Sequence, residues 1–350
     1  MASSRPLYVP HSRALTILYA DLESHALEPA EAFLGTAGSV IERRNASGFR
    51  FYARQYYDGE GKKRESYVAG PVGNPSADAT AENVRLRIKE IKNLVPSLRM
   101  LGREGYNLAD ARTYGTLASL ANYGVFTSGG WLIGSHAYGV LLNRLGARAA
   151  AYGTEDIDIA RAGALAFERQ PAESFLDMLR TSGVDFVEVP RIERGAPSTS
   201  FKQRGRSHFH VDLLVPSPSE TFPVVAVPEL KAHATGLPYL QYLLADSQMA
   251  LLLSREGLCT VRVPLPERFA VHKLIVSRLR VERATKSDND VFQASVLAAV
   301  LSDSQTGALE EAVAALPSRA RQHLPPALDS ARRYLEAAHP RAWAELERRQ

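Results

Sequence analysis

Two aspartates stand one residue apart in the short stretch Glu155-Asp156-Ile157-Asp158-Ile159 of this 350-residue chain. We expect a strand here, and because side chains alternate along a strand, the carboxylates of Asp156 and Asp158 project from one face. Neighbouring carboxylates repel each other unless they share a cation, and oxygen ligands of this kind suit Mg²⁺ or Mn²⁺. Taken alone, the Asp-x-Asp pair is as typical of a solvated strand end as of a metal site.

A candidate phosphate site lies upstream, where the apolar residues 130–133 lead into Gly134 and Ser135. We expect a buried strand followed by a helix that runs to about residue 145. The free N–H groups and the positive dipole end of such a helix start favour a phosphate. Glycine permits close approach of the backbone, and the Ser135 hydroxyl can donate a hydrogen bond or cap the helix.

A third acid, Asp212, lies in His208-Phe209-His210-Val211-Asp212, where a strand over 207–215 places it on the same face as His208 and His210. Three carboxylates beside a phosphate-binding helix start are typical of a two-metal phosphoryl-transfer site. The alternative is a metal-dependent phosphohydrolase that binds a transition metal through His208 and His210. We prefer packing or hydrogen bonding for these histidines, because the sequence offers no second histidine cluster.

The pattern of an apolar strand, Gly-Ser, a helix, an Asp-x-Asp strand and a later Asp resembles the DNA polymerase β-like nucleotidyltransferase superfamily. The matching residues are Gly134, Ser135, Asp156, Asp158 and Asp212. The chain also resembles a bacterial nucleotidyltransferase-fold group, the GSU2403 family, from about residue 36 to 301. Its shared segments are Gly-Ser-His-Ala-Tyr-Gly, Glu-Asp-Ile-Asp-Ile-Ala, Val-Asp-Leu-Leu-Val-Pro, Pro-Glu-Arg-Phe-Ala-Val-His-Lys-Leu and the Gly-Pro that follows the N-terminal hairpin.

The resemblance implies a nucleotidyltransferase, an enzyme of the EC 2.7.7 type, that uses two Mg²⁺ (or Mn²⁺) ions. Asp156 and Asp158 would hold the metals, Asp212 would complete the metal site, and Gly134 and Ser135 would cradle the phosphates of an NTP. An acceptor hydroxyl on a protein, an RNA or a small molecule would attack the α-phosphorus and release pyrophosphate. The main alternative is a catalytically inactive module that binds nucleotide or nucleic acid, but the presence of all three carboxylates favours the enzyme.

Charge is unevenly distributed along the chain. The total of 42 Lys and Arg against 38 Asp and Glu, a net charge of +4, is too small to indicate nucleic-acid binding by itself. Two segments are strongly basic, with five basic residues against one acidic in 191–206 and six against one in 268–286. We expect both segments to border the carboxylates and Lys273, Lys286 and Arg204 to bind the nucleotide, although a solvated surface is the simpler interpretation of such runs.

The N-terminal part combines aromatic and basic residues in a predicted hairpin, with strands over 47–57 and 62–68 and an Asp-Gly turn at 58–61. Aromatic and cationic side chains on a sheet can stack bases and hold phosphates. The simpler interpretation, which we prefer, is a small sheet that buries one aromatic face and exposes the other to water. A helix over 80–101 follows.

The resulting fold class is an α/β (α+β) nucleotidyltransferase core with a mixed sheet, between two other domains. We expect a hairpin-and-helix module over 1–105, the core over 106–235 and a helical domain over 236–350. Further core elements are a helix capped by Asn107 that ends before Gly124, a helix over 172–181 and a strand over 184–189. In the last domain we expect helices over 237–244, 267–283, 288–301, 309–316 and 328–338, with a short strand over 259–263.

Composition excludes several other classes. The single cysteine, Cys259, rules out a disulfide framework and a Cys-rich zinc module. No apolar run approaches the ~18 residues that span a bilayer, and the N-terminus lacks an export or transit signal. We therefore expect a cytoplasmic protein whose partners are an NTP and an acceptor, with nucleic acid as one option and no membrane.

Overall fold

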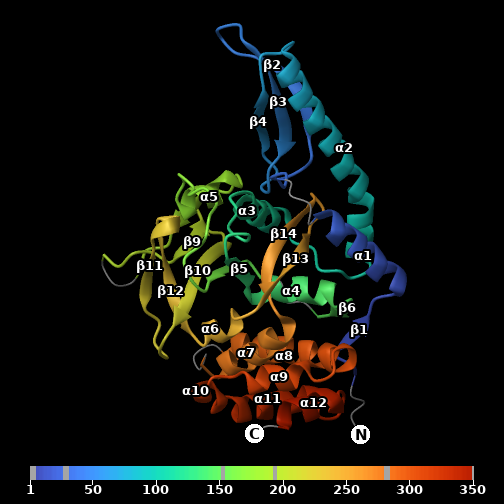
Figure 1. The fold of residues 1–350 in the computed structure, drawn as a ribbon, viewed down its shortest axis with the longest axis vertical. Helices are drawn as coiled ribbons and strands as arrows, with labels where there is room; N and C mark the ends of the chain where they lie inside the picture. The colour runs from blue at the N-terminus through green and yellow to red at the C-terminus, as the bar shows by residue number, and fades with distance from the viewer. Residues whose placement is uncertain (1–4, 27–30, 151–153, 192–194, 280–283, 349–350) are drawn as a thin grey trace.

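The computed structural model describes residues 5–26, 31–150, 154–191, 195–279 and 284–348 (Figure 1). A mixed sheet forms the centre, with strand order β11-β12-β10-β7-β5, and β9 and β8 extend it from β10. The strands of the main path are β5 (Gly130–Ile133), β7 (Asp156–Arg161), β10 (His210–Ser217), β11 (Val224–Val227) and β12 (Ala232–Pro238). β10 pairs in parallel with β7 and β12, whereas β5–β7 and β11–β12 are antiparallel. The expected α/β class with a mixed sheet is confirmed.

Short elements complete the core around this sheet. They are α3 (Ala111–Asn122), α4 (Gly134–Arg144), β6 (Ala147–Ala149), α5 (Phe175–Thr181), β8 (Phe186–Glu188), β9 (Ser200–Gln203) and the 3-10 turn Pro228–Leu230. The side chain of Asp110 caps α3 by accepting from the N–H groups of Arg112 and Thr113. β5 leads directly into α4, whose residues 137–143 are all buried, so the Gly134 junction is held between two packed elements.

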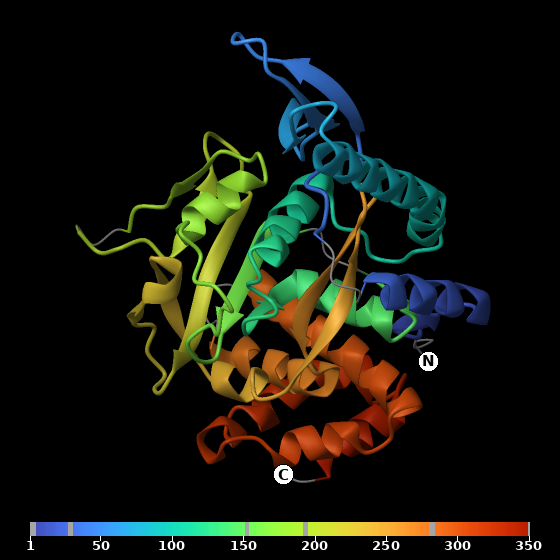
Figure 2. The same ribbon diagram turned by 45° about the horizontal axis from the view of Figure 1, so that its top comes forward.

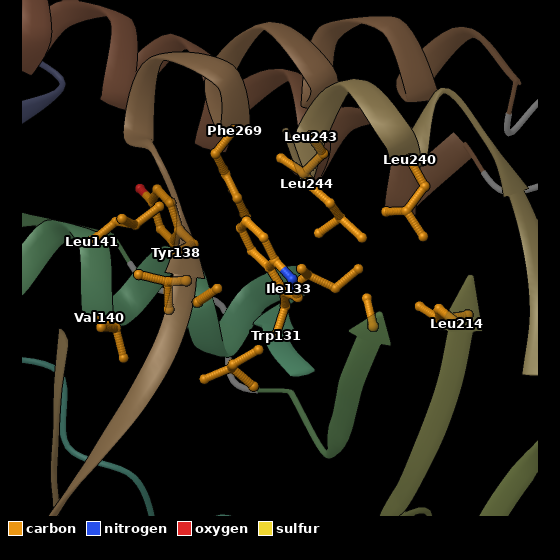
Figure 3. Packing of buried hydrophobic residues seen from close by; sticks show 14 of the residues in the cluster. Trp131, Ile133, Tyr138, Val140, Leu141, Leu214, Leu240, Leu243, Leu244 and Phe269 are labelled. Atoms are coloured by element: carbon orange, nitrogen blue, oxygen red, sulfur yellow. The ribbon is translucent and has the colours of Figure 1, made fainter. Parts of the chain in front are cut away.

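The C-terminal third packs helices against one end of the sheet, at the bottom of Figure 1. The hairpin β13 (Ser247–Leu253) and β14 (Leu258–Pro264) leads into this layer, which consists of α6 (Leu240–Leu243), α7 (Pro266–Leu279), α8 (Ala284–Ser304), α9 (Ala308–Ala314), α10 (Ser318–Arg321), α11 (Leu324–Leu335) and α12 (Pro340–Glu347). Figure 3 shows Phe269 of α7 and Leu243 of α6 beside Trp131 and Ile133 of β5. From Asp290 to Ser302 α8 is buried at all but one position, as expected for a helix that other helices surround.

A small N-terminal sheet stands at the opposite end of the molecule from these helices (Figures 1 and 2). Its strands β2 (Ser39–Arg44), β3 (Arg50–Tyr57) and β4 (Lys63–Ala69) pack beside the long helix α2 (Pro75–Arg103), which the side chain of Asn74 caps. β1 (Tyr8–Pro10) pairs with β6, and α1 (Arg13–Ala26) follows it. None of the described helices is long and apolar enough to cross a membrane.

The structure confirms the elements nearest the candidate site: the strands over 130–133 and 156–159, and the helix that starts at Gly134–Ser135. The N-terminal hairpin is also confirmed, although its third strand β2 was not expected. The expected helix over 267–283 is α7 as far as Leu279, and 280–283 lie outside the described residues. The helices over 288–301, 309–316 and 328–338 correspond to α8, α9 and α11 with shifted ends.

Two expectations about local structure were wrong. Residues 237–244 do not form one helix, because β12 extends to Pro238 through parallel pairing with β10, and Tyr239 then takes a left-handed conformation before the single turn α6. Asn107 does not cap α3. Its main-chain N–H and side-chain amide both donate to the Asn143 side chain on α4, and Asp110 takes the cap position.

The packing of α4 against the core can be tested at Leu141, because the side chain of this residue is fully buried in the main core. We expect Leu141→Ala to lower the free energy of unfolding by about 2–5 kcal/mol in chemical denaturation. Leu86→Ala, at a side chain of α2 that is 50% exposed, should change it by at most about 0.5 kcal/mol. Equal effects of the two substitutions would contradict the packing described.

Candidate active site

The candidate site is built on the parallel pairing of β7 with β10. In this register His210 lies opposite Asp156, and Asp212 lies opposite Asp158. Because residues two apart on a strand share a face, and paired residues of neighbouring strands share it too, all four side chains project from one side of the sheet. The side chains of Asp156, His210 and Asp212 are each a little more than a quarter exposed, so solvent reaches the group.

Two cationic side chains neutralise these carboxylates. The His210 ring lies between two of them, with Nδ1 3.3 Å from Asp156 Oδ1 and Nε2 3.5 Å from Asp212 Oδ2. Lys286 of α8 places its Nζ 2.9 Å from Asp156 Oδ2. Ser200 of β9 adds a neutral partner, since its hydroxyl donates to Asp212 Oδ1. The carboxylates of Asp156 and Asp212 are therefore compensated within the protein.

The same contacts shift two pKa values in opposite directions. The hydrogen bond to Asp212 is the main reason that the pKa of His210 rises from 6.5 to about 9, against the opposing effect of burial. Burial acts to raise the pKa of Asp212, but the hydrogen bonds from His210 and Ser200 outweigh it and leave that pKa below its ordinary value. At neutral pH the pair is an imidazolium and a carboxylate.

The start of α4 lies against this cluster and requires glycine. Gly134 has a φ of +68°, and a Cβ atom added there would overlap the Asp158 carboxylate. The residue before the helix is Ile133, whose side chain offers no cap hydrogen bond, so Ser135 is the second helical residue rather than the N-cap. Instead the Ser135 hydroxyl accepts from the side-chain amide of Gln293, at 3.3 Å.

These groups line one cleft of about 980 Å³ between the sheet and helices α7 and α8. One part of its wall is polar and includes Gly134, Ser135, Asp156, Asp158 and Asp212. The other part is apolar and includes Leu214, Phe222, Leu237, Leu243, Phe269 and Val276. The arrangement can hold a molecule with one highly charged end and one flat or apolar end.

Of the expected nucleotide-binding cations, the structure brings two into the cleft. Lys286 reaches Asp156, and Lys273 lines the wall while its Nζ lies 2.6 Å from Asp290 Oδ1. Arg204 does not line the cleft, because it is exposed and pairs with Asp185 at 2.8 Å. The basic segments therefore border the site only in part, through Lys273 and Lys286 of 268–286; Arg194, Arg280 and Arg283 lie outside the described residues.

Sequence reasoning missed two side chains that hold site residues in place. Ser200 lies on β9, a strand that was not expected, and Gln293 lies in the middle of the buried helix α8. Neither belongs to a motif, and β9, with the sequence Ser-Phe-Lys-Gln, carries no apolar pattern that would mark Ser200. His208 lines the cleft, and its main-chain carbonyl accepts a hydrogen bond from His210 Nδ1.

The donor set fits a divalent cation in ligand type and in strand position, since three carboxylates lie on one face of two paired strands. Over the described part of the chain, no three His, Cys, Asp or Glu side chains converge on one point in the rotamers observed. Here His210 and Lys286 occupy carboxylate oxygens that a metal would use. Metal loading therefore requires these cations to give up oxygens of Asp156 and Asp212.

Comparison with models of protein families identifies a match. A sequence model of the family NTP_transf_8, described as nucleotidyltransferase, matches residues 112–317, which is more than half of the chain. The matched region begins in α3 and extends beyond α9, so it includes the central sheet, the hairpin β13–β14 and helices α7 and α8. No curated protein matches the chain.

The raised pKa of His210 predicts a pH-dependent stability. The pKa of His210 is about 9 in the folded state and 6.5 as its ordinary value, so protonated His210 stabilises the fold. This stabilisation is fully present below about pH 6.5 and is lost as the pH rises through 9. In denaturation with EDTA, the free energy of unfolding should therefore fall by about 1–3 kcal/mol more in the wild type than in His210→Gln across this window. His208→Gln keeps the main-chain carbonyl that His210 uses and should behave like the wild type. Parallel pH profiles for wild type and His210→Gln would refute the assignment.

Proposed function

The chain belongs to the nucleotidyltransferase family, and from that premise we propose that its cleft transfers a nucleoside monophosphate from an NTP to an acceptor hydroxyl. The observation that carries this proposal is the register of β7 and β10, which aligns Asp158 with Asp212 next to the Gly134–Ser135 helix start. Carboxylates for a metal and open N–H groups for a phosphate then lie within one cleft. The likeness to the DNA polymerase β-like pattern supports the same assignment.

The carboxylates have a defined role in this proposal. Asp156, Asp158 and Asp212 would hold two Mg²⁺ (or Mn²⁺) ions. Bound there, the ions would neutralise the triphosphate and make the acceptor hydroxyl more acidic. In the reaction, the acceptor oxygen forms a bond to the α-phosphorus, and the bond from that phosphorus to the bridging oxygen of the β-phosphate breaks. Pyrophosphate leaves with the electron pair, and the acceptor proton passes to Asp212 and then to solvent.

The groups around the carboxylates would position the triphosphate. The first N–H groups of α4, at Gly134 and Ser135, would hold the β and γ phosphates, and Gln293 would keep the Ser135 hydroxyl in place. Lys286 now pairs with Asp156, and we propose that it moves to the triphosphate when metal takes over that carboxylate. Lys273, which also lines the cleft, would add positive charge. Catalysis by such a site consists mostly of alignment and charge neutralisation.

The acceptor is a hydroxyl of a protein, an RNA or a small molecule, and the apolar wall of the cleft offers a surface for the nucleobase or for part of the acceptor. Arg204, which pairs with Asp185 outside the cleft, has no part in the proposal.

Isosteric replacement of the carboxylates tests the proposed transfer. With each α-³²P-labelled NTP, Mg²⁺ and a cell extract as the source of acceptor, the wild type should transfer label and release pyrophosphate. Asp156→Asn/Asp158→Asn should lower the rate at least roughly a hundredfold, because a site without its metal ligands cannot stabilise the transition-state charge. Asp329→Asn, at an acid of α11 that is 77% exposed, should retain full activity.

The outcomes of this assay also distinguish a nucleotidyltransferase from the two alternative functions, a binding module and a phosphohydrolase. Equal labelling by the wild type and the double variant would refute the mechanism. Saturable NTP binding without any transfer would indicate a binding module. Free labelled nucleoside mono- or diphosphate, lost in His210→Ala, would instead indicate a phosphohydrolase.

Gly134 offers an independent test of the phosphate cradle. Gly134→Ala forces a Cβ atom toward the Asp158 carboxylate at a positive φ, so we expect transfer to fall at least roughly a hundredfold and stability to fall by about 1–3 kcal/mol. Gly163→Ala is the matched control, because a Cβ atom added there meets nothing within 4 Å and its φ is ordinary. The transfer rates of the two variants are measured side by side. Equal rates would contradict the close approach between Gly134 and the Asp158 carboxylate.

A further inference from the structure

A second surface with the properties of a binding site lies on the N-terminal sheet, at the opposite end of the molecule from helices α7 and α8 (Figure 1). Three aromatic rings lie in a row there. The centroids of Phe49 and Phe51 are 6.2 Å apart with nearly parallel rings, and those of Phe51 and Tyr67 are 5.7 Å apart. Phe49 is 41% exposed and Tyr67 is 64% exposed, so the row faces solvent.

The two faces of this sheet differ in what covers them. On the inner face, the Tyr52 hydroxyl donates to Asp78 of α2, and the Arg54 guanidinium donates to main-chain carbonyls, among them that of Leu34. Phe51 alternates with these residues along β3, and Tyr67 pairs with Ala53 on β4, so the aromatic row belongs to the outer face. The inner face therefore supplies the packing that holds the sheet, and the outer aromatics remain available for a ligand.

The charge around this row is suited to a polyanion. The strands and turns of the sheet, residues 39–69, hold seven Lys and Arg against four Asp and Glu, a net charge of +3. Arg43 lies opposite Phe51 on the neighbouring strand β2, so the two side chains project from the same outer face. The pair between Arg43 and Glu65 is about 40% exposed on both sides and contributes little stability, so the guanidinium can exchange this carboxylate for a phosphate.

We propose that the outer face of the sheet β2–β3–β4 binds single-stranded nucleic acid. Successive bases would stack on Phe49, Phe51 and Tyr67 while Arg43 neutralises the backbone. Single strands are the class that fits, because a duplex keeps the faces of its bases stacked inside and offers only phosphates to flat rings. A protein partner would use the same rings but would gain little from the net charge of +3 on the sheet. The proposal does not depend on the transfer reaction, because neither nucleotide nor metal takes part in it.

Fluorescence anisotropy with the full chain tests this inference. The probes are fluorescein-labelled oligo(U) of about 12 nucleotides and a duplex of the same length, in EDTA and without NTP. We expect saturable binding of the single strand that weakens as salt is added, and binding of the duplex at least roughly tenfold weaker. Phe49→Ala/Tyr67→Ala should weaken single-strand binding at least roughly tenfold. Arg43→Gln should reduce the salt dependence.

Leu86→Ala provides the matched control, since Leu86 is half exposed on α2, outside the aromatic row, and its loss should leave binding unchanged. Thermal unfolding of each variant near the wild-type temperature shows that the sheet still folds. Absence of saturable binding by the wild type would overturn the proposal and leave a protein as the partner of this face. Unchanged binding by Phe49→Ala/Tyr67→Ala would overturn it as well, because binding would then come from charge elsewhere.

Discussion

Parallel pairing of β7 with β10 sets His210 against Asp156 and Asp212 against Asp158, so three carboxylates and an imidazole share one face of the sheet. Such a concentration of negative charge is unfavourable unless cations compensate it. Here the compensation comes from the imidazolium of His210 and the ammonium of Lys286. The close contact between Gly134 and the Asp158 carboxylate fixes the position of α4 next to the same charges. The rest of the site follows from this one register.

Helices α7 and α8 complete the site rather than merely support the sheet. Lys286 and Gln293 of α8 reach Asp156 and Ser135, and Lys273 of α7 lines the same cleft. The family match covers both the sheet and these helices, which agrees with a site made from the two together. The small N-terminal sheet lies outside the match, and its aromatic outer face gives the molecule a second surface with different chemistry.

Local patterns were enough to predict which elements bear the acids. Alternation around Ile157 and the glycine that opens α4 are properties of neighbouring residues, and they identified the strands and the helix start. The neutralising cations were harder to predict, because Lys286 and Asp156 are 130 residues apart and only tertiary packing selects Lys286 over Arg204. Strand β12 was missed for a similar reason. Its burial alternates, but the sequence Ala-His-Ala-Thr-Gly-Leu-Pro holds few strand-forming residues, and only the pairing with β10 and β11 keeps its glycine and proline in a strand.

The central claim is that the carboxylates of β7 and β10, with the start of α4, form a metal–triphosphate site that His210 and Lys286 occupy until substrate binds. A crystal structure of the protein with Mg²⁺ and an NTP analogue that has a non-cleavable link between the α and β phosphates tests it most directly. We predict metal on Asp156, Asp158 and Asp212, phosphates at Gly134 and Ser135, and Lys286 released from Asp156 toward the triphosphate. Nucleotide bound elsewhere, with Lys286 still on Asp156 and His210 between the carboxylates, would contradict the account.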